Sequence, residues 1–265
     1  MRRTLLLLIV LLIPVLVFAG GQQEGAQQEE GPEGPGQDTD VMSERSEAPD
    51  ENVLEFPTLL GGTYMDWMKT VYNKAGAPHV AQIPMAAYDK NSELHPIAAE
   101  SWEVSDDGLT WTFNLREDLL WSDGEPLTAR DFEFALERAV TQGYDFGWYW
   151  SWAGGVANWG AVESGDAPLS DLGVEAVDEN TLTITTNAPK PYLPGVTAFL
   201  FPVPEHVVEE HGDEWASSAE NYVSSGPFML TEWIRGDRYV LEKNPNYNGP
   251  WAAQVDRINL YPALG

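Results

Sequence analysis

Cysteine is absent from this chain of 265 residues, which excludes disulfides, thiol nucleophiles and cysteine metal sites. Basic residues are scarce as well: 14 Lys and Arg stand against 42 Asp and Glu, for a formal net charge of -28 at pH 7. A surface of this charge repels nucleic acids and anionic lipid head groups, so neither is an expected partner. We interpret the acidity as a source of solubility or as adaptation to a saline habitat, in preference to a specific cationic ligand.

The strongly apolar segment at the N-terminus is shorter than a membrane-spanning helix. Residues 5–18 are apolar, whereas a spanning helix needs roughly twenty such residues. The pair Arg2-Arg3 precedes the segment, and Ala19 follows it with the small side chain typical of a signal-peptidase site. We therefore predict a signal peptide over residues 1–19, cleaved after Ala19. Gly20 stands where a lipid-bearing cysteine would follow the cleavage site, so we expect a free, non-lipidated periplasmic protein.

The next segment, residues 20–50, consists largely of Gly, Gln, Glu and Pro and has almost no large apolar side chain. Such a segment cannot bury enough surface to offset the loss of chain entropy on folding. We predict a disordered acidic linker here.

Hydrophobic periodicity predicts strands and helices in the rest of the chain. Apolar and polar residues alternate over residues 110–116, which is typical of a half-buried strand. Thr128 precedes a helical stripe and Asp131 stands three residues later, so we expect a capped helix that ends near Gly143. Shorter elements are expected as hairpins over residues 173–186 and 228–243, a helix over 204–210 and a strand over 256–261. This mixture predicts an α/β, or mixed α+β, fold class.

Aromatic residues crowd a glycine-rich stretch between Gly143 and Gly160. They are Trp148, Tyr149, Trp150, Trp152 and Trp159. Neither the helical nor the strand period fits them, so we predict a loop. Two interpretations stay open: exposed aromatics that bind a ligand, or a local aromatic cluster packed beneath the loop.

The chain offers few groups for metal binding or catalysis. Its histidines are His79, His95, His206 and His211. The last two are five residues apart on the expected short helix, which puts them on different faces. We interpret all four as solvent-exposed and predict no metal site. Acidic pairs such as Asp106-Asp107 stand at expected turns, where turn formation and solvation explain them without acid–base catalysis.

Several ordered segments together resemble family 5 of the bacterial extracellular solute-binding proteins, the group that binds oligopeptides and dipeptides. The segments are residues 98–116, 121–132, 171–178, 225–228 and 241–247. The resemblance extends from Leu94 to the C-terminus, while residues 51–90 match poorly and lack the Leu-Asp-Pro that usually opens the fold. Trp102, Trp111 and Phe113 lie in the signature segment, where we expect them to build the fold instead of touching a ligand.

The resemblance implies a two-lobed binding protein of the class II-like periplasmic fold, with a hinged cleft between its lobes. It implies a peptide ligand held mainly through its backbone, an ABC permease and ATPase as partners, and contact with the membrane through the permease alone. It also implies a monomer without cofactor or enzymatic activity. In the oligopeptide branch the stretch that matches residues 143–160 lines the cleft, so Tyr149 and Trp150 are the expected ligand contacts. Trp148 and Trp121 are further candidates.

Two alternatives to peptide binding stay open. Some relatives bind oligosaccharides or metal chelates, and the 11 Trp residues suit stacking against sugars. A secreted glycosidase with two catalytic carboxylates is more remote, because no motif supports it beyond abundant acids and aromatics.

The resemblance also predicts a division of the chain into lobes. Residues 51–63 and 172–265 are expected in the larger lobe, and residues 64–171 in a smaller inserted domain. Relatives run to about twice this length, so a second large lobe, with the acidic group that meets the peptide amino terminus, is expected to be absent. We expect Ile258 and Leu260 to need a covering layer, and their sheet to be completed by segments from the missing half. The chain alone should then be marginally stable, bind no ligand tightly and self-associate more as salt rises.

Overall fold

The computed structural model describes residues 52–58, 65–69 and 78–262. The predicted signal peptide, residues 1–19, and the predicted linker, residues 20–50, lie outside the described residues. Among the described helices, none has both the length and the apolar character needed to cross a bilayer.

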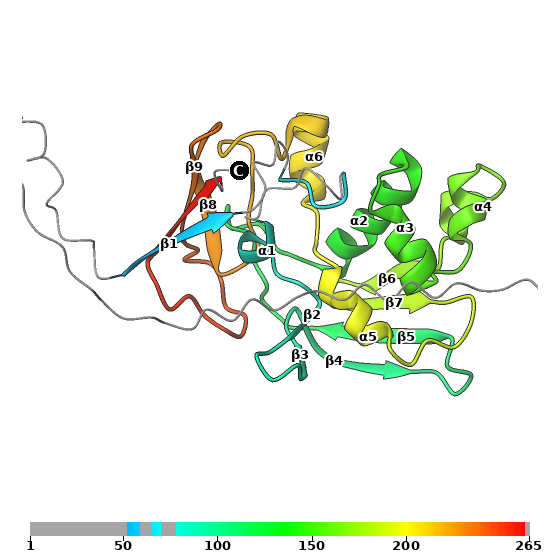
Figure 1. Cartoon of the computed structure of the whole chain (residues 1–265). Helices are drawn as coiled ribbons and strands as arrows, with labels where there is room; N and C mark the ends of the chain where they lie inside the picture. The colour runs from blue at the N-terminus through cyan, green and yellow to red at the C-terminus, as the bar shows by residue number, and fades with distance from the viewer. Residues whose placement is uncertain (1–51, 59–64, 70–77, 263–265) are drawn as a thin grey trace, which may run out of the picture. The chain divides into compact units, whose positions relative to one another are not determined.

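One sheet contains four antiparallel strands in the order β4-β5-β7-β6 (Figure 1). Its strands are β4 (Ala99–Val104), β5 (Thr110–Leu115), β6 (Val174–Asp178) and β7 (Thr181–Thr185). The alternation predicted for residues 110–116 is confirmed, because Trp111, Phe113 and Leu115 are buried while the residues between them are half-buried. The hairpin predicted over residues 173–186 is also confirmed, as β6 and β7.

The helix α2 (Ala129–Gln142) packs against β6 and β7 of this sheet. Its buried stripe includes Phe132, Ala135 and Leu136. The carboxylate of Asp131 accepts a hydrogen bond from the backbone N–H of Thr128 at 2.8 Å, and Gly143 ends the helix in the left-handed region with φ 61°. The predicted capped helix is therefore confirmed at both ends.

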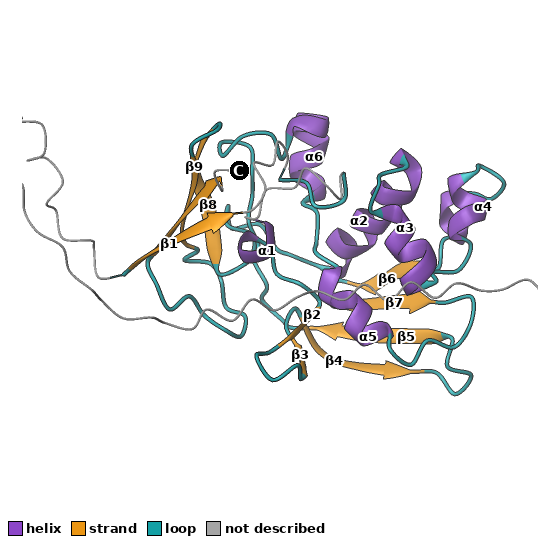
Figure 2. Ribbon diagram, in the orientation of Figure 1, coloured by secondary structure: helices purple, strands orange, loops and turns teal. Residues whose placement is uncertain are grey.

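A second sheet has the order β1-β10-β9-β8, drawn in orange in Figure 2. Its strands are β1 (Val53–Thr58), β8 (Phe228–Ile234), β9 (Arg238–Lys243) and β10 (Arg257–Pro262). The predicted hairpin over residues 228–243 and the strand over 256–261 are confirmed. β1 pairs in parallel with β10, although the motif expected to open the fold is missing from the sequence.

The covering layer expected over Ile258 and Leu260 is supplied by the described residues. Both side chains are buried in the core formed by the described residues. Their neighbours in β1, Leu54 and Phe56, are instead exposed, because β1 is the edge strand of the described sheet.

Short elements connect the two sheets. They are α1 (Pro78–Ala81), the hairpin β2 (Ala86–Tyr88) and β3 (Leu94–Pro96), α5 (Leu193–Val196), η3 (Thr197–Phe199), α6 (Glu205–His211) and η4 (Gly212–Glu214). A further short element, η2 (Leu169–Asp171), precedes β6 of the first sheet. The short helix predicted over residues 204–210 corresponds to α6.

The hairpin β6-β7 affects the boundary of the predicted smaller domain, residues 64–171. β7 pairs with β5 along its whole length, so a boundary at residue 172 would separate the two halves of one sheet. We propose that the smaller domain continues through β7 to the segment before α6.

The prediction of a loop between Gly143 and Gly160 is wrong, because the segment is mostly helical. It contains α3 (Gly147–Tyr149), the π-helix η1 (Trp150–Gly154) and the beginning of α4 (Trp159–Glu163). Each element spans three to five residues, which is too short for a hydrophobic period to emerge, and a π-helix does not follow the α-helical period.

Candidate ligand-binding surface

Six aromatic residues from distant parts of the chain form what we term the aromatic surface: Tyr88, Trp148, Tyr149, Trp152, Tyr192 and Phe199. Trp152 is 74% exposed and Tyr149 is half-buried, whereas the other four are each about half exposed. The six come from β2, α3, η1, the segment before α5, and η3. Large aromatic groups left accessible to solvent are typical of a binding surface.

Ring contacts connect most members of the aromatic surface. The ring centroids of Trp148 and Trp152 are 6.1 Å apart, and those of Trp148 and Tyr149 are 5.9 Å apart in an edge-on arrangement. Tyr149 in turn packs edge-on against Phe199 at 5.6 Å. Tyr88 joins from β2, where Gly195 of α5 leaves room for its hydroxyl.

The Tyr149 side chain is held in place by a polar contact as well. Its hydroxyl donates a hydrogen bond to the carbonyl of Val196 at 3.2 Å. Burial raises the pKa of Tyr149 to about 12, and the neighbouring Tyr88 adds to the rise. The hydroxyl therefore stays protonated at neutral pH, and its proton is used in the hydrogen bond to the Val196 carbonyl.

Among the described residues, the one cationic side chain with a recorded contact to this surface is that of Lys190. The ammonium of Lys190 lies 5.6 Å from the ring centroid of Tyr192 and donates to the carbonyl of Trp152 at 3.3 Å. Among the described residues no carboxylate lies within ion-pair distance of Lys190. Its charge is therefore available to an anionic group of a ligand.

Of the four predicted contact residues, the structure brings Trp148 and Tyr149 together on the aromatic surface. Trp150 and Trp121 are fully buried. Trp150 packs beneath Tyr149 with its ring centroid 5.5 Å away, and Trp121 lies beside His206 of α6. Ligand contact by any of the four stays a prediction.

Sequence reasoning missed Tyr88, Tyr192, Phe199 and Lys190. Lys190 and Tyr192 lie in a proline-rich segment, residues 189–194. The prolines could have marked this segment as a rigid, exposed connection. Nothing in the pattern around Tyr88 or Phe199 indicates that they meet.

The described residues also bring together one group of metal-ligand side chains: Asp89, Glu93 and His95, on the β2-β3 hairpin. Their ligand atoms lie within 4.8 Å of one another. His206 forms a different pair, with its Nε2 2.8 Å from Oδ2 of Asp123. His206 and His211 do not meet in a common cluster of metal ligands in the part of the chain that is described.

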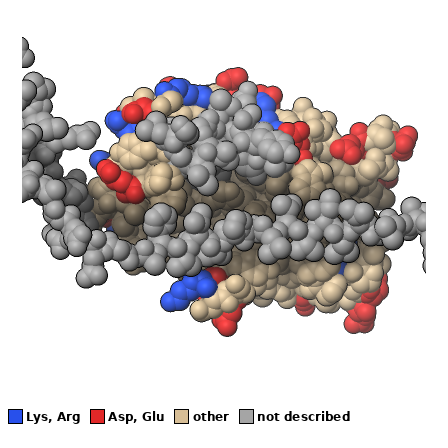
Figure 3. Space-filling model, viewed as in Figure 1, with Lys and Arg blue, Asp and Glu red and all other residues tan. Residues whose placement is uncertain are grey.

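Figure 3 shows acidic and basic side chains along the rim of the visible face, where that face is not covered by atoms drawn in grey.

Comparisons with known proteins agree with the fold. A model of the family described as bacterial extracellular solute-binding proteins, family 5 Middle, matches residues 93–263. A probable deoxycholate-binding periplasmic protein of Escherichia coli K12 is 40% identical over 163 residues, 60% of this chain and 30% of that protein. The periplasmic oligopeptide-binding protein of Salmonella typhimurium LT2 is 39% identical over 182 residues, 66% of this chain and 32% of that protein.

A solved structure, the Haemophilus influenzae OppA complex with RPPGFSPFR, aligns with a TM-score of 0.72 and 31% identity and covers 80% of this chain and 42% of that chain. The chain thus spans about a third of the length of the curated relatives. The mixed α/β class predicted from the sequence is confirmed by this match. Because the family model matches well over half of its residues, the chain belongs to family 5 of the bacterial extracellular solute-binding proteins.

Proposed function

We propose that this chain belongs to the solute-binding component of an ABC importer and binds peptides for delivery to the permease. The observation that carries the proposal is the alignment, over 80% of the chain, with a relative solved in complex with a nine-residue peptide. The two curated relatives, from Escherichia coli and Salmonella typhimurium, are named as periplasmic proteins, which supports an extracytoplasmic location. A cleaved signal peptide ending at Ala19 and the absence of a lipid anchor belong to this proposal.

In this function the aromatic surface contacts the side chains of the ligand. Trp148 and Trp152 offer flat apolar faces, and stacking on such faces tolerates many side chains, which suits a binding protein of broad specificity. Lys190 offers its charge to a carboxylate of the ligand. We propose Tyr149 as the residue that fixes the position of Trp148 and Phe199.

One observation favours a second ligand class. The E. coli relative at 40% identity is named as a probable deoxycholate-binding protein, and deoxycholate is an apolar, anionic molecule. A large aromatic face beside one lysine suits such a molecule too. Oligosaccharides and metal chelates remain alternatives from the sequence, and an enzymatic role such as glycoside hydrolysis is not part of the proposal.

The test is calorimetric titration of the purified chain with pools of short peptides, with deoxycholate and with oligosaccharides. We expect peptides to bind, and Trp152→Ala to weaken binding about tenfold, since a stacked aromatic contact contributes roughly 0.5–1.5 kcal/mol beyond the area that it buries. Phe56→Ala is the matched control, because Phe56 is also an exposed aromatic residue but lies on β1 of the second sheet, outside the aromatic surface.

Lys190→Met tests the charge separately, because the variant keeps an unbranched apolar side chain. We expect it to weaken binding of peptides with a free C-terminal carboxylate more than binding of the same peptides with a C-terminal amide. Binding of deoxycholate or sugars alone would move the function to that ligand class. Release of reducing sugar from a polysaccharide would contradict a purely binding role.

A further inference from the structure

The β2-β3 hairpin places three metal-ligand side chains on one of its faces. Ala87 pairs with His95 and Tyr88 with Leu94, and Asp89 N donates to the carbonyl of Glu93 at the next position. Because side chains alternate along a strand, Asp89, Glu93 and His95 share a face with Ala87.

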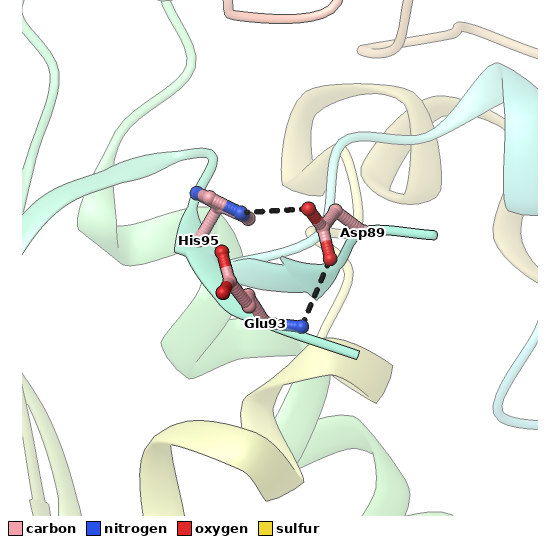
Figure 4. Close-up of side chains that lie close together, drawn as sticks. All are labelled: Asp89, Glu93 and His95. Carbon is pink, nitrogen blue, oxygen red and sulfur yellow. Dashed lines mark hydrogen bonds and ion pairs between the residues drawn. The ribbon is translucent and has the colours of Figure 1, made fainter. Parts of the chain in front are cut away.

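The three side chains converge, as Figure 4 shows. Nε2 of His95 is 3.4 Å from Oδ2 of Asp89, and the set of ligand atoms from the three residues lies within 4.8 Å. Two ligands of a tetrahedral zinc ion, each at about 2.1 Å from the metal, are themselves about 3.4 Å apart. The spacing therefore needs little rearrangement to accept an ion.

The hairpin turn holds one of the ligands ready. Oδ1 of Asp89 accepts the backbone N–H groups of Asn91 and Glu93 at 2.8 and 2.9 Å. These bonds fix the orientation of the carboxylate, whose Oδ2 accepts the side-chain amide of Asn91 at 3.2 Å and lies 3.4 Å from Nε2 of His95.

Turn formation alone does not explain Glu93. Its carboxylate joins a second carboxylate and one imidazole, and among the described residues no lysine or arginine pairs with it. The two carboxylates repel each other, and a divalent ion bound between them would offset that repulsion.

We propose that Asp89, Glu93 and His95 form a binding site for a divalent transition-metal ion of the zinc class, with water completing its coordination. The imidazole selects Zn²⁺, Ni²⁺ or Cu²⁺ over Ca²⁺ and Mg²⁺, which prefer sites made of oxygen alone. The site does not depend on the proposed peptide function, although it directly follows Tyr88 of the aromatic surface in the chain.

The experiment is calorimetric titration of the metal-free chain, purified without a polyhistidine tag, with ZnCl₂ in the presence of excess Ca²⁺. The calcium occupies weak sites on the acidic surface. We expect one zinc ion per chain with a dissociation constant on the order of micromolar, as three exposed ligands allow. His95→Gln and Glu93→Gln should each weaken binding at least tenfold, with unchanged circular dichroism and unchanged thermal unfolding of the metal-free chain.

His206→Gln is the matched control, because His206 also pairs with an aspartate but has no second carboxylate in a described metal-ligand cluster. Its affinity for zinc should equal that of the wild type. Titration with Co²⁺ adds a spectroscopic signature, since visible absorption bands of a low-symmetry site should appear in the wild type and disappear in His95→Gln. Zinc binding that survives both hairpin variants, or that excess Ca²⁺ abolishes, would overturn the proposal and assign the ion to the acidic surface in general.

Discussion

At the scale of single residues, Trp150 and Trp152 show how far two neighbouring tryptophans can differ. Trp150 is fully buried, while Trp152 is 74% exposed. We expect Trp150→Ala to lower the free energy of unfolding by about 3–5 kcal/mol, because it empties a large volume in the core. Trp152→Ala should change the same quantity by less than about 0.5 kcal/mol. Urea unfolding followed by circular dichroism measures both, and equal losses in the two variants would contradict the assignment.

Asp131 gives a pH-dependent prediction at the same scale. Burial raises its pKa to about 6, against the lowering effect of the N–H groups of Thr128 and Glu205 and the charge of His206. The folded state therefore holds the proton more tightly than the unfolded state, and the contribution of Asp131 to stability falls as pH rises from about 4 to 6. Over this window we expect Asp131 to lower the free energy of unfolding by up to about 3 kcal/mol.

Asp131→Asn tests this contribution, since the amide keeps an oxygen that can accept the Thr128 N–H but no longer titrates. We expect the difference in stability between wild type and variant to change with pH between 4 and 6, as measured by urea unfolding at several pH values. Asp145→Asn, at an exposed position after α2, is the control. If the stability difference between wild type and Asp131→Asn were constant between pH 4 and 6, the pKa of Asp131 would not be raised by folding, and the prediction would be wrong.

At the scale of elements, the segment of Ser225, Gly226 and Pro227 has a structural role that the sequence pattern did not disclose. The N–H groups of Ser225 and Gly226 both donate to the carbonyl of Ala81 at the end of α1, at 3.0 and 2.9 Å. The Ser225 hydroxyl accepts the N–H of Ile83 and donates to the buried Gln82. The segment thus ties the start of β8 to α1.

Gly226→Ala should disrupt this junction. A Cβ at Gly226 would come within 2.9 Å of backbone atoms of Val80, Ala81 and Gln82, which cannot move aside as a flexible side chain can. We expect a loss of about 1–3 kcal/mol in the free energy of unfolding. Gly160→Ala in α4 is the matched control: its Cβ would meet nothing within 4 Å, so thermal unfolding should show no loss. Equal effects of the two substitutions would refute the role of close packing at Gly226.

The elements also show what sequence could and could not predict. Sequence could predict the elements that have a clear hydrophobic period or clear turn residues. These are β4-β5, the hairpins β6-β7 and β8-β9, and α2, and most of their strand pairing joins segments close together in the chain. The pairing of β1 with β10 joins segments about 200 residues apart, which no local pattern encodes. The aromatic surface is non-local in the same way: Tyr88, Tyr149 and Phe199 meet only through the fold.

At the scale of the whole molecule, net charge and the edge of the second sheet act against each other. β1 is the edge strand of the described sheet, and its Leu54 and Phe56 are exposed. An exposed edge with apolar side chains favours pairing with a second chain. The net charge of -28 opposes that approach, but salt screens it, with a Debye length of about 10 Å at 0.1 M and 3 Å at 1 M.

We therefore expect self-association of the chain to rise with salt, measured by light scattering between 0.05 and 1 M NaCl. Leu54→Lys should reduce the association, because it places a charge on the exposed edge. Leu169→Lys makes the same chemical change at an exposed leucine in η2, away from the strand edges, and should leave the salt dependence as in the wild type. If both lysine variants reduced association equally, net charge alone would be responsible. A monodisperse monomer at every salt concentration would show that the β1 edge does not pair in solution.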